Sequence, residues 1–120
     1  MLVDIHTHQL KSEGFEAIQI LNYFIQDESI DPNAKELFSV GLHPWHADLI
    51  DWIPEKLSIF LTKPNLVAIG EIGIDKLNST PLPHQIAIFK DQAQIAHKQG
   101  LPIIIHCVKA YSEILAVKKK

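Results

Sequence analysis

The sequence predicts an α/β fold built from about four strand-helix units. Four short apolar runs recur at similar intervals, at residues 2–5, 38–42, 66–72 and 101–107. Segments with helical spacing of apolar residues separate these runs, and the unit repeats about every thirty residues, as in βαβ architectures. The runs therefore read as parallel strands joined by right-handed crossovers. Because no repeat, low-complexity tract or Gly/Ser-rich linker interrupts the pattern, we expect residues 1–120 to form a single domain.

Helical spacing predicts a helix in each connecting segment. The first is expected over about residues 12–25, because Phe15, Ile18 and Leu21 recur at helical intervals behind a potential cap at Ser12. The other helices are expected at about residues 51–63, at residues 83–99 with Gly100 as the stop, and from about residue 110 onward.

The composition limits the classes of function. With 47% apolar and 21% charged residues the chain is globular, and it contains no apolar run long enough to cross a bilayer. We therefore expect no membrane partner. The single cysteine, Cys107, cannot form a disulfide within the chain, so a cytoplasmic location is expected. The formal net charge is −3 and all 11 basic residues are lysines, so phosphate recognition must rely on lysine, backbone amides or a metal ion.

The first predicted strand ends in a possible metal site. Asp4, His6 and His8 alternate with Ile5 and Thr7, so their side chains share one face of the strand. Two imidazoles on one face suit a divalent ion, although two histidines exposed in a loop would give the same string. Asp4 either orients one of the imidazoles or is satisfied by backbone amides.

The later strands also end in ionisable residues. Glu71 lies between two glycines after an apolar strand, where a carboxylate is costly to bury without a cation, and His106 ends the last strand. His43 follows the second strand and has either a structural or a functional role. Trp45 and Trp52 either cover the rim or stack on a nucleobase. Asp75 is expected to cap the next segment. Carboxyl ends of parallel strands meet at one edge, so His6, His8, Glu71 and His106 form a candidate metal-ligand set.

Several motifs, in this order, resemble the TatD family of metal-dependent deoxyribonucleases. They are Asp4-Ile-His-Thr-His8, Gly41-Leu-His-Pro44, Gly70-Glu-Ile-Gly-Ile-Asp75, the helix from Gln85 to Gln92, and Leu101-Pro-Ile-Ile-Ile-His106. The resemblance covers nearly the whole chain. It implies a TIM barrel that binds one or two divalent ions (Mg, Mn or Zn) and hydrolyses phosphodiester bonds of DNA through metal-activated water.

The resemblance also implies a role for each motif residue. His6 and His8 would hold the first metal, Glu71 would bridge the two metals and serve in catalysis, and His106 would hold the second. His43 would lie toward the substrate. Members of the family commonly carry an arginine two positions after the last of these histidines; Val108 stands there in this chain, and Lys109 is the nearest replacement.

The length limits what the resemblance implies. A TIM barrel usually needs about 250 residues, and this chain supplies about four of the eight units, so we expect a half-barrel or a truncated chain. A further histidine and a late aspartate of the family site are absent. An open half-barrel would expose strand edges, which predicts self-association or coverage by a further segment.

Three other functions are compatible with the same residues. An amidohydrolase also opens with two histidines one residue apart, but that resemblance would place a lysine at the end of the fourth strand, where this chain has His106. A phosphatase acting on small phosphomonoesters opens in the same way. The third alternative is a fragment that binds metal without catalysis, because the second half of the site is absent.

Overall fold

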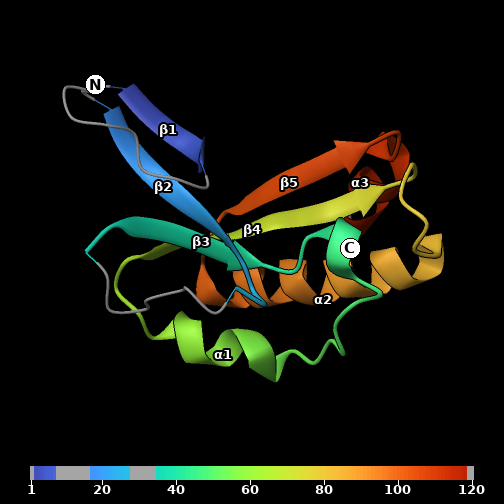
Figure 1. The fold of residues 1–120 in the computed structure, drawn as a ribbon, viewed down its shortest axis with the longest axis horizontal. Helices are drawn as coiled ribbons and strands as arrows, with labels where there is room; N and C mark the ends of the chain where they lie inside the picture. The colour runs from blue at the N-terminus through green and yellow to red at the C-terminus, as the bar shows by residue number, and fades with distance from the viewer. Residues whose placement is uncertain (1, 8–16, 28–34, 119–120) are drawn as a thin grey trace.

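Five parallel strands form one sheet in the order β1-β2-β3-β4-β5 (Figure 1). The computed structural model describes residues 2–7, 17–27 and 35–118. The strands are β1 (Leu2–Thr7), β2 (Ala17–Phe24), β3 (Leu37–Gly41), β4 (Leu66–Asp75) and β5 (Ile103–Val108). The helices are η1 (Pro44–His46), α1 (Glu55–Leu61), α2 (Leu82–Gln99) and α3 (Tyr111–Lys118). The predicted α/β fold is confirmed.

The three later helices form where their spacing predicts them. Helix α2 begins with a proline in its first turn, where a missing N–H costs no intrahelical bond. It ends at Gly100, which adopts a left-handed conformation (φ 67°) and donates its N–H to the carbonyls of Ala96 and His97. Pro54 is the N-cap of α1 and directly precedes its first residue.

The prediction of a helix over residues 12–25 is wrong for the part that the structure describes, because residues 17–24 form strand β2. Residues 12–16 lie outside the described residues. Neighbouring side chains Leu21 and Asn22, which point to opposite faces, are both buried, and β2 pairs with β1 at one edge and with β3 at the other. A strand buried on both faces does not alternate between apolar and polar residues, so its pattern resembles that of a buried helix.

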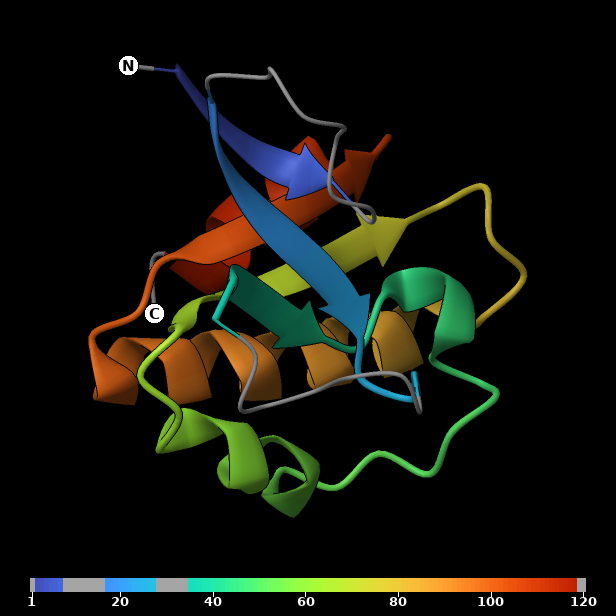
Figure 2. The same cartoon turned by 60° about the vertical axis from the view of Figure 1, so that its left-hand side comes forward.

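The apolar core lies between the sheet and helices α1 and α2, which cover the same face of the sheet in both views (Figures 1 and 2). Strand β4 lies between β3 and β5 and is buried along almost all of its length. This packing fixes β4 against α2 and so positions Glu71 and Asp75, which lie in the carboxyl half of β4. The large apolar side chains with 2% exposure or less are Phe38, Val40, Leu42, Leu57, Ile69, Ile72, Ile74 and Phe89.

Among the described residues, no helix is both long and apolar enough to cross a membrane.

Candidate metal centre

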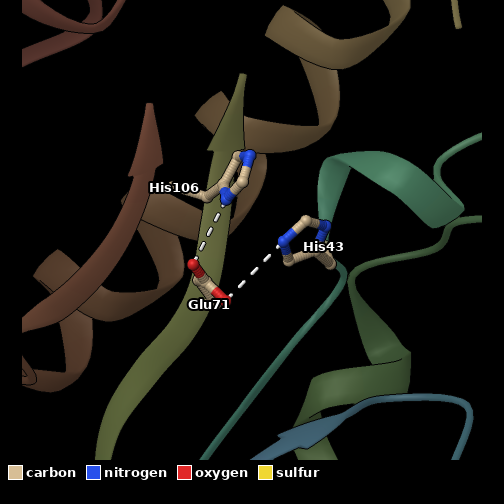
Figure 3. Close-up of side chains that lie close together, drawn as sticks. All are labelled: His43, Glu71 and His106. Atoms are coloured by element: carbon tan, nitrogen blue, oxygen red, sulfur yellow. Dashed lines mark hydrogen bonds and ion pairs between the residues drawn. The ribbon is translucent and has the colours of Figure 1, made fainter. Parts of the chain in front are cut away.

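Three strand ends bring His43, Glu71 and His106 together (Figure 3). Each side chain offers a ligand atom, and these atoms lie within 4.8 Å of one another. Glu71 lies on β4 between the two imidazoles. Its Oε2 is 3.3 Å from Nδ1 of His106, and its Oε1 is 3.6 Å from Nε2 of His43. The three groups form the candidate metal centre.

The register between β4 and β5 explains how His106 reaches two carboxylates. His106 pairs with Gly73, and Gly73 lies midway between Glu71 and Asp75 at alternate positions of β4. Because residues two apart share a face of a strand, the imidazole lies over a glycine and between two acidic side chains. Its Nε2 is 3.0 Å from Oδ2 of Asp75, on the other side from Glu71.

Asp75 is a site residue as well as the predicted cap. Its Oδ1 accepts from the N–H of Leu77, as a cap should, while its Oδ2 also accepts from Nε1 of Trp45 at 2.8 Å. Burial raises the pKa of the Asp75 carboxyl, but the hydrogen bonds from Trp45, His106 and Leu77 outweigh burial and hold the pKa below its usual value. Asp75 is therefore an ionised acceptor beside His106.

His106 lies between two carboxylates, Asp75 and Glu71, each of which can only accept a hydrogen bond. Nε2 makes the shorter contact, 3.0 Å to Asp75 against 3.3 Å from Nδ1 to Glu71, so we assign the proton of neutral His106 to Nε2, which leaves a lone pair on Nδ1 facing Glu71. Nδ1 and the carboxylate Oε2 are then two acceptors 3.3 Å apart, which a cation or an added proton must bridge. Two ligands that each lie about 2.1 Å from one metal ion are about 3.4 Å apart at a tetrahedral angle, so the pair fits a divalent ion.

His43 has the same tautomer as His106, with the proton on Nε2. Its Nδ1 accepts a hydrogen bond of 3.1 Å from the N–H of Trp45 and caps η1. In neutral His43 the proton is therefore on Nε2, the atom that faces Glu71. A protonated nitrogen cannot bind a metal, so His43 suits donation to a carboxylate or a substrate oxygen better than metal ligation. The expected position of His43 toward the substrate stays a prediction.

Two buried glutamines of α2 hold the main chain beside the site. Gln92 accepts from the N–H of Leu42 at 2.7 Å and donates to its carbonyl at 3.1 Å. Gln85 accepts from the N–H of Asp75 at 2.8 Å and donates to its carbonyl at 3.1 Å. Each glutamine thus pairs both main-chain groups of one residue, and these residues are Asp75 itself and the neighbour of His43.

Replacement of Gln92 is expected to destabilise the protein. Leucine at this position removes both hydrogen bonds and leaves the buried N–H and carbonyl of Leu42 unpaired, which is expected to lower the free energy of unfolding by about 3 kcal/mol. Gln94→Leu on the exposed face of the same helix is the matched control and should change it by less than about 0.5 kcal/mol. Urea titration of both variants measures the difference. Equal midpoints for both would contradict the proposed role of Gln92.

The first strand is described only in part. Asp4 and His6 lie on β1, whose pairing with β2 shifts register between Asp4 and Thr7, and His8 lies outside the described residues. Lys109 follows β5 with a left-handed backbone (φ 56°) and an exposed side chain. The roles expected for these four residues remain predictions.

Comparison with known proteins identifies the family. Residues 26–120 match the family described as TatD related DNase. The chain belongs to this family. The matched part includes His43, Glu71 and His106, whereas Asp4, His6 and His8 precede it. The resemblance inferred from the motifs is confirmed.

Individual TatD relatives are similar over part or all of the chain. The human 3'-5' RNA nuclease TATDN2 is 36% identical over 67% of this chain and 11% of its own length. The 3'-5' ssDNA/RNA exonuclease TatD of Erwinia billingiae is 34% identical over 66% of this chain and 31% of its own. The metal-dependent hydrolase YabD of Bacillus subtilis, itself uncharacterized, is 27% identical over the whole chain and 56% of its own length.

A solved structure shares the fold. The TatD homolog YjjV of Escherichia coli K12 superposes with a TM-score of 0.80 over 98% of this chain and 55% of YjjV, at 20% sequence identity. The likeness supports a half-barrel of TIM-barrel type, as predicted. The chain spans about a third or less of the first two curated relatives and just over half of YabD and YjjV.

Proposed function

We propose that the protein is a metal-dependent hydrolase that cleaves phosphodiester bonds of nucleic acid, with DNA as a substrate. The observation that carries the proposal is the distance of 3.3 Å between Glu71 Oε2 and His106 Nδ1, which is the spacing of adjacent metal ligands. Relatives of the chain are named as nucleases of RNA and single-stranded DNA, which supports nucleic acid as the substrate class.

Glu71 and His106 would hold a divalent metal ion, with His6 and His8 as further ligands. One or two divalent ions supply Lewis acidity and lower the pKa of a bound water toward neutrality. A mixed imidazole and carboxylate set is compatible with Mn²⁺, Zn²⁺ or Mg²⁺. Asp4 would orient an imidazole of β1, as Asp75 orients that of His106.

The remaining residues act through their own hydrogen bonds. Asp75 keeps the proton of His106 on Nε2, so that Nδ1 stays available. His43 keeps a proton on Nε2 and can donate it to a nonbridging phosphate oxygen beside Glu71. Glu71 accepts the hydrogen bond or proton of a water in the site and so acts in catalysis. Lys109 would contact a phosphate in place of arginine.

The proposed location is the cytoplasm, which the lone cysteine supports. Self-association is also proposed, because β5 is an edge strand among the described residues and its Ile105 side chain is 43% exposed.

A nuclease assay tests the proposed function. The purified protein is expected to shorten a 5'-labelled single-stranded DNA oligonucleotide, to stop in EDTA, and to recover when Mg²⁺ or Mn²⁺ is added back. A small phosphomonoester and a cyclic amide, assayed in parallel, represent the phosphatase and amidohydrolase alternatives. Turnover of either compound without cleavage of the oligonucleotide contradicts the proposal. Metal binding without any turnover indicates a non-catalytic fragment.

A further inference from the structure

We propose that Trp45 is a platform on which an unpaired base of the substrate stacks, next to the phosphate bound at the metal centre. The inference rests on the proposed function and adds to it the part of the substrate that is recognised. It makes Trp45 a substrate-binding residue and single-stranded nucleic acid the preferred form, since a base within a duplex has no free face to offer.

The first argument is the position of the indole. The Trp45 ring lies against both imidazoles of the site, with ring centroids 4.6 Å from that of His43 and 5.6 Å from that of His106. Its Nε1 donates to the buried carboxylate of Asp75 at 2.8 Å. A nucleotide whose phosphate lies beside these imidazoles, whose centroids are 4.4 Å apart, has its base about one sugar unit away, within reach of the exposed Trp45 ring.

The second argument is that Trp45 is exposed although it is fixed. The side chain is 51% exposed, while its hydrogen bond to Asp75 and its ring contacts hold the indole in one orientation. A fixed aromatic face loses little conformational freedom when a base stacks on it. Trp52 differs: its Nε1 binds Asp91 and its ring packs against the apolar core. Trp52 therefore covers the apolar core, whereas the exposed ring of Trp45 suits stacking on a base.

The charge of the chain also favours a stacking contact. Nucleic-acid binding usually relies on attraction between basic side chains and phosphates, yet this chain has a formal net charge of −3 and its basic residues are all lysines. Stacking does not depend on charge, and it tolerates any base because every base has a π face. A stacking platform therefore compensates for weak attraction to the phosphates.

A single-tryptophan variant tests the contact directly. The chain has two tryptophans, so Trp52→Phe leaves Trp45 as the sole indole emitter. The probe is a single-stranded DNA oligonucleotide with phosphorothioate linkages, added to the Mn²⁺-loaded protein. Its binding is expected to quench the emission of Trp45, and a probe with an abasic terminal nucleotide should quench it much less. Equal quenching by both probes overturns the inference, as does binding without quenching.

Kinetics separate stacking from an indirect effect through Asp75. Trp45→Ala is expected to raise KM about tenfold for a normal oligonucleotide, equivalent to about 1.4 kcal/mol, with kcat little changed. Trp45→Phe keeps a ring but loses the hydrogen bond to Asp75, and it should stay within about threefold of the parent protein. On an oligonucleotide with an abasic end, the effect of alanine should disappear. An effect of the same size on that substrate shows that Trp45 acts through Asp75 and overturns stacking.

The two proposals can fail separately. A protein that cleaves no phosphodiester but shows base-dependent quenching refutes the proposed function and keeps the stacking site. A protein that cleaves normal and abasic ends equally well, with or without Trp45, keeps the function and refutes the stacking site. Absence of both cleavage and oligonucleotide binding refutes both.

Discussion

Glutamine in place of Glu71 is expected to abolish tight binding of divalent metal and to lower nuclease activity on the order of a thousandfold. The substitution keeps the size of the side chain and removes its charge, so the acceptor that pairs with His106 Nδ1 across 3.3 Å is lost. A metal ligand contributes several kcal/mol of transition-state stabilisation, and each 1.4 kcal/mol corresponds to a tenfold change in rate. Titration calorimetry with Mn²⁺ and the oligonucleotide assay measure the two effects.

Glu55→Gln is the matched control for this substitution. Glu55 lies in the first turn of α1, with an exposed side chain, and the same chemical change there should leave metal affinity and rate within about twofold. Both variants should unfold at similar urea concentrations. If Glu71→Gln retains parental metal affinity, the carboxylate is not a ligand and the proposed centre is wrong.

Alanine in place of Gly73 is expected to lower the free energy of unfolding more than any other substitution proposed, by about 3 kcal/mol or more. A Cβ added at Gly73 would lie 1.8 Å from the carbonyl oxygen of His106. This neighbour is main chain of β5, which cannot rotate away, so β4 and β5 must separate where they carry Glu71 and His106. Overpacking against a side chain usually costs about 1–3 kcal/mol, and contact with main chain should cost at least as much. Urea denaturation measures the loss.

Gly100→Ala separates the close approach at Gly73 from the general effect of adding a methyl group to a glycine with positive φ. Gly100 also has a positive φ of 67°, but no atom lies within 4 Å of an added Cβ. Only backbone strain remains there, about 1 kcal/mol. Gly73→Ala should therefore destabilise the protein clearly more than Gly100→Ala. Equal losses of unfolding free energy for the two variants would indicate that β4 and β5 do not approach each other closely at Gly73.

Much of the fold follows from local signals in the sequence. Helix α2 has a proline at its start and Gly100 at its end, so both boundaries could be predicted from backbone chemistry. Strand β2 could not, because Ile18 and Leu21 fit a helical period as well as a buried strand. The choice depends on pairing with β1 and β3, which are distant in sequence.

The site could be predicted only in part for a similar reason. Glu71 and His106 are recognisable because each follows a run of apolar residues, and the carboxyl ends of parallel strands meet at one edge of a sheet. The role of Asp75 depends on the register that places His106 opposite Gly73. The spacing of Glu71, Gly73 and Asp75, each two residues from the next, could have predicted that they lie on one face of the strand. The tautomer of His43 depends on one hydrogen bond from Trp45, which spacing alone does not reveal.

Anomalous X-ray diffraction from crystals soaked in Mn²⁺ tests the central claim most directly. We expect a manganese peak about 2.1 Å from both a Glu71 oxygen and Nδ1 of His106, with Nε2 of His106 still bound to Asp75 and Nε2 of His43 outside the coordination sphere. A peak bound to His43 Nε2, or a fully occupied metal elsewhere with none between Glu71 and His106, would contradict it.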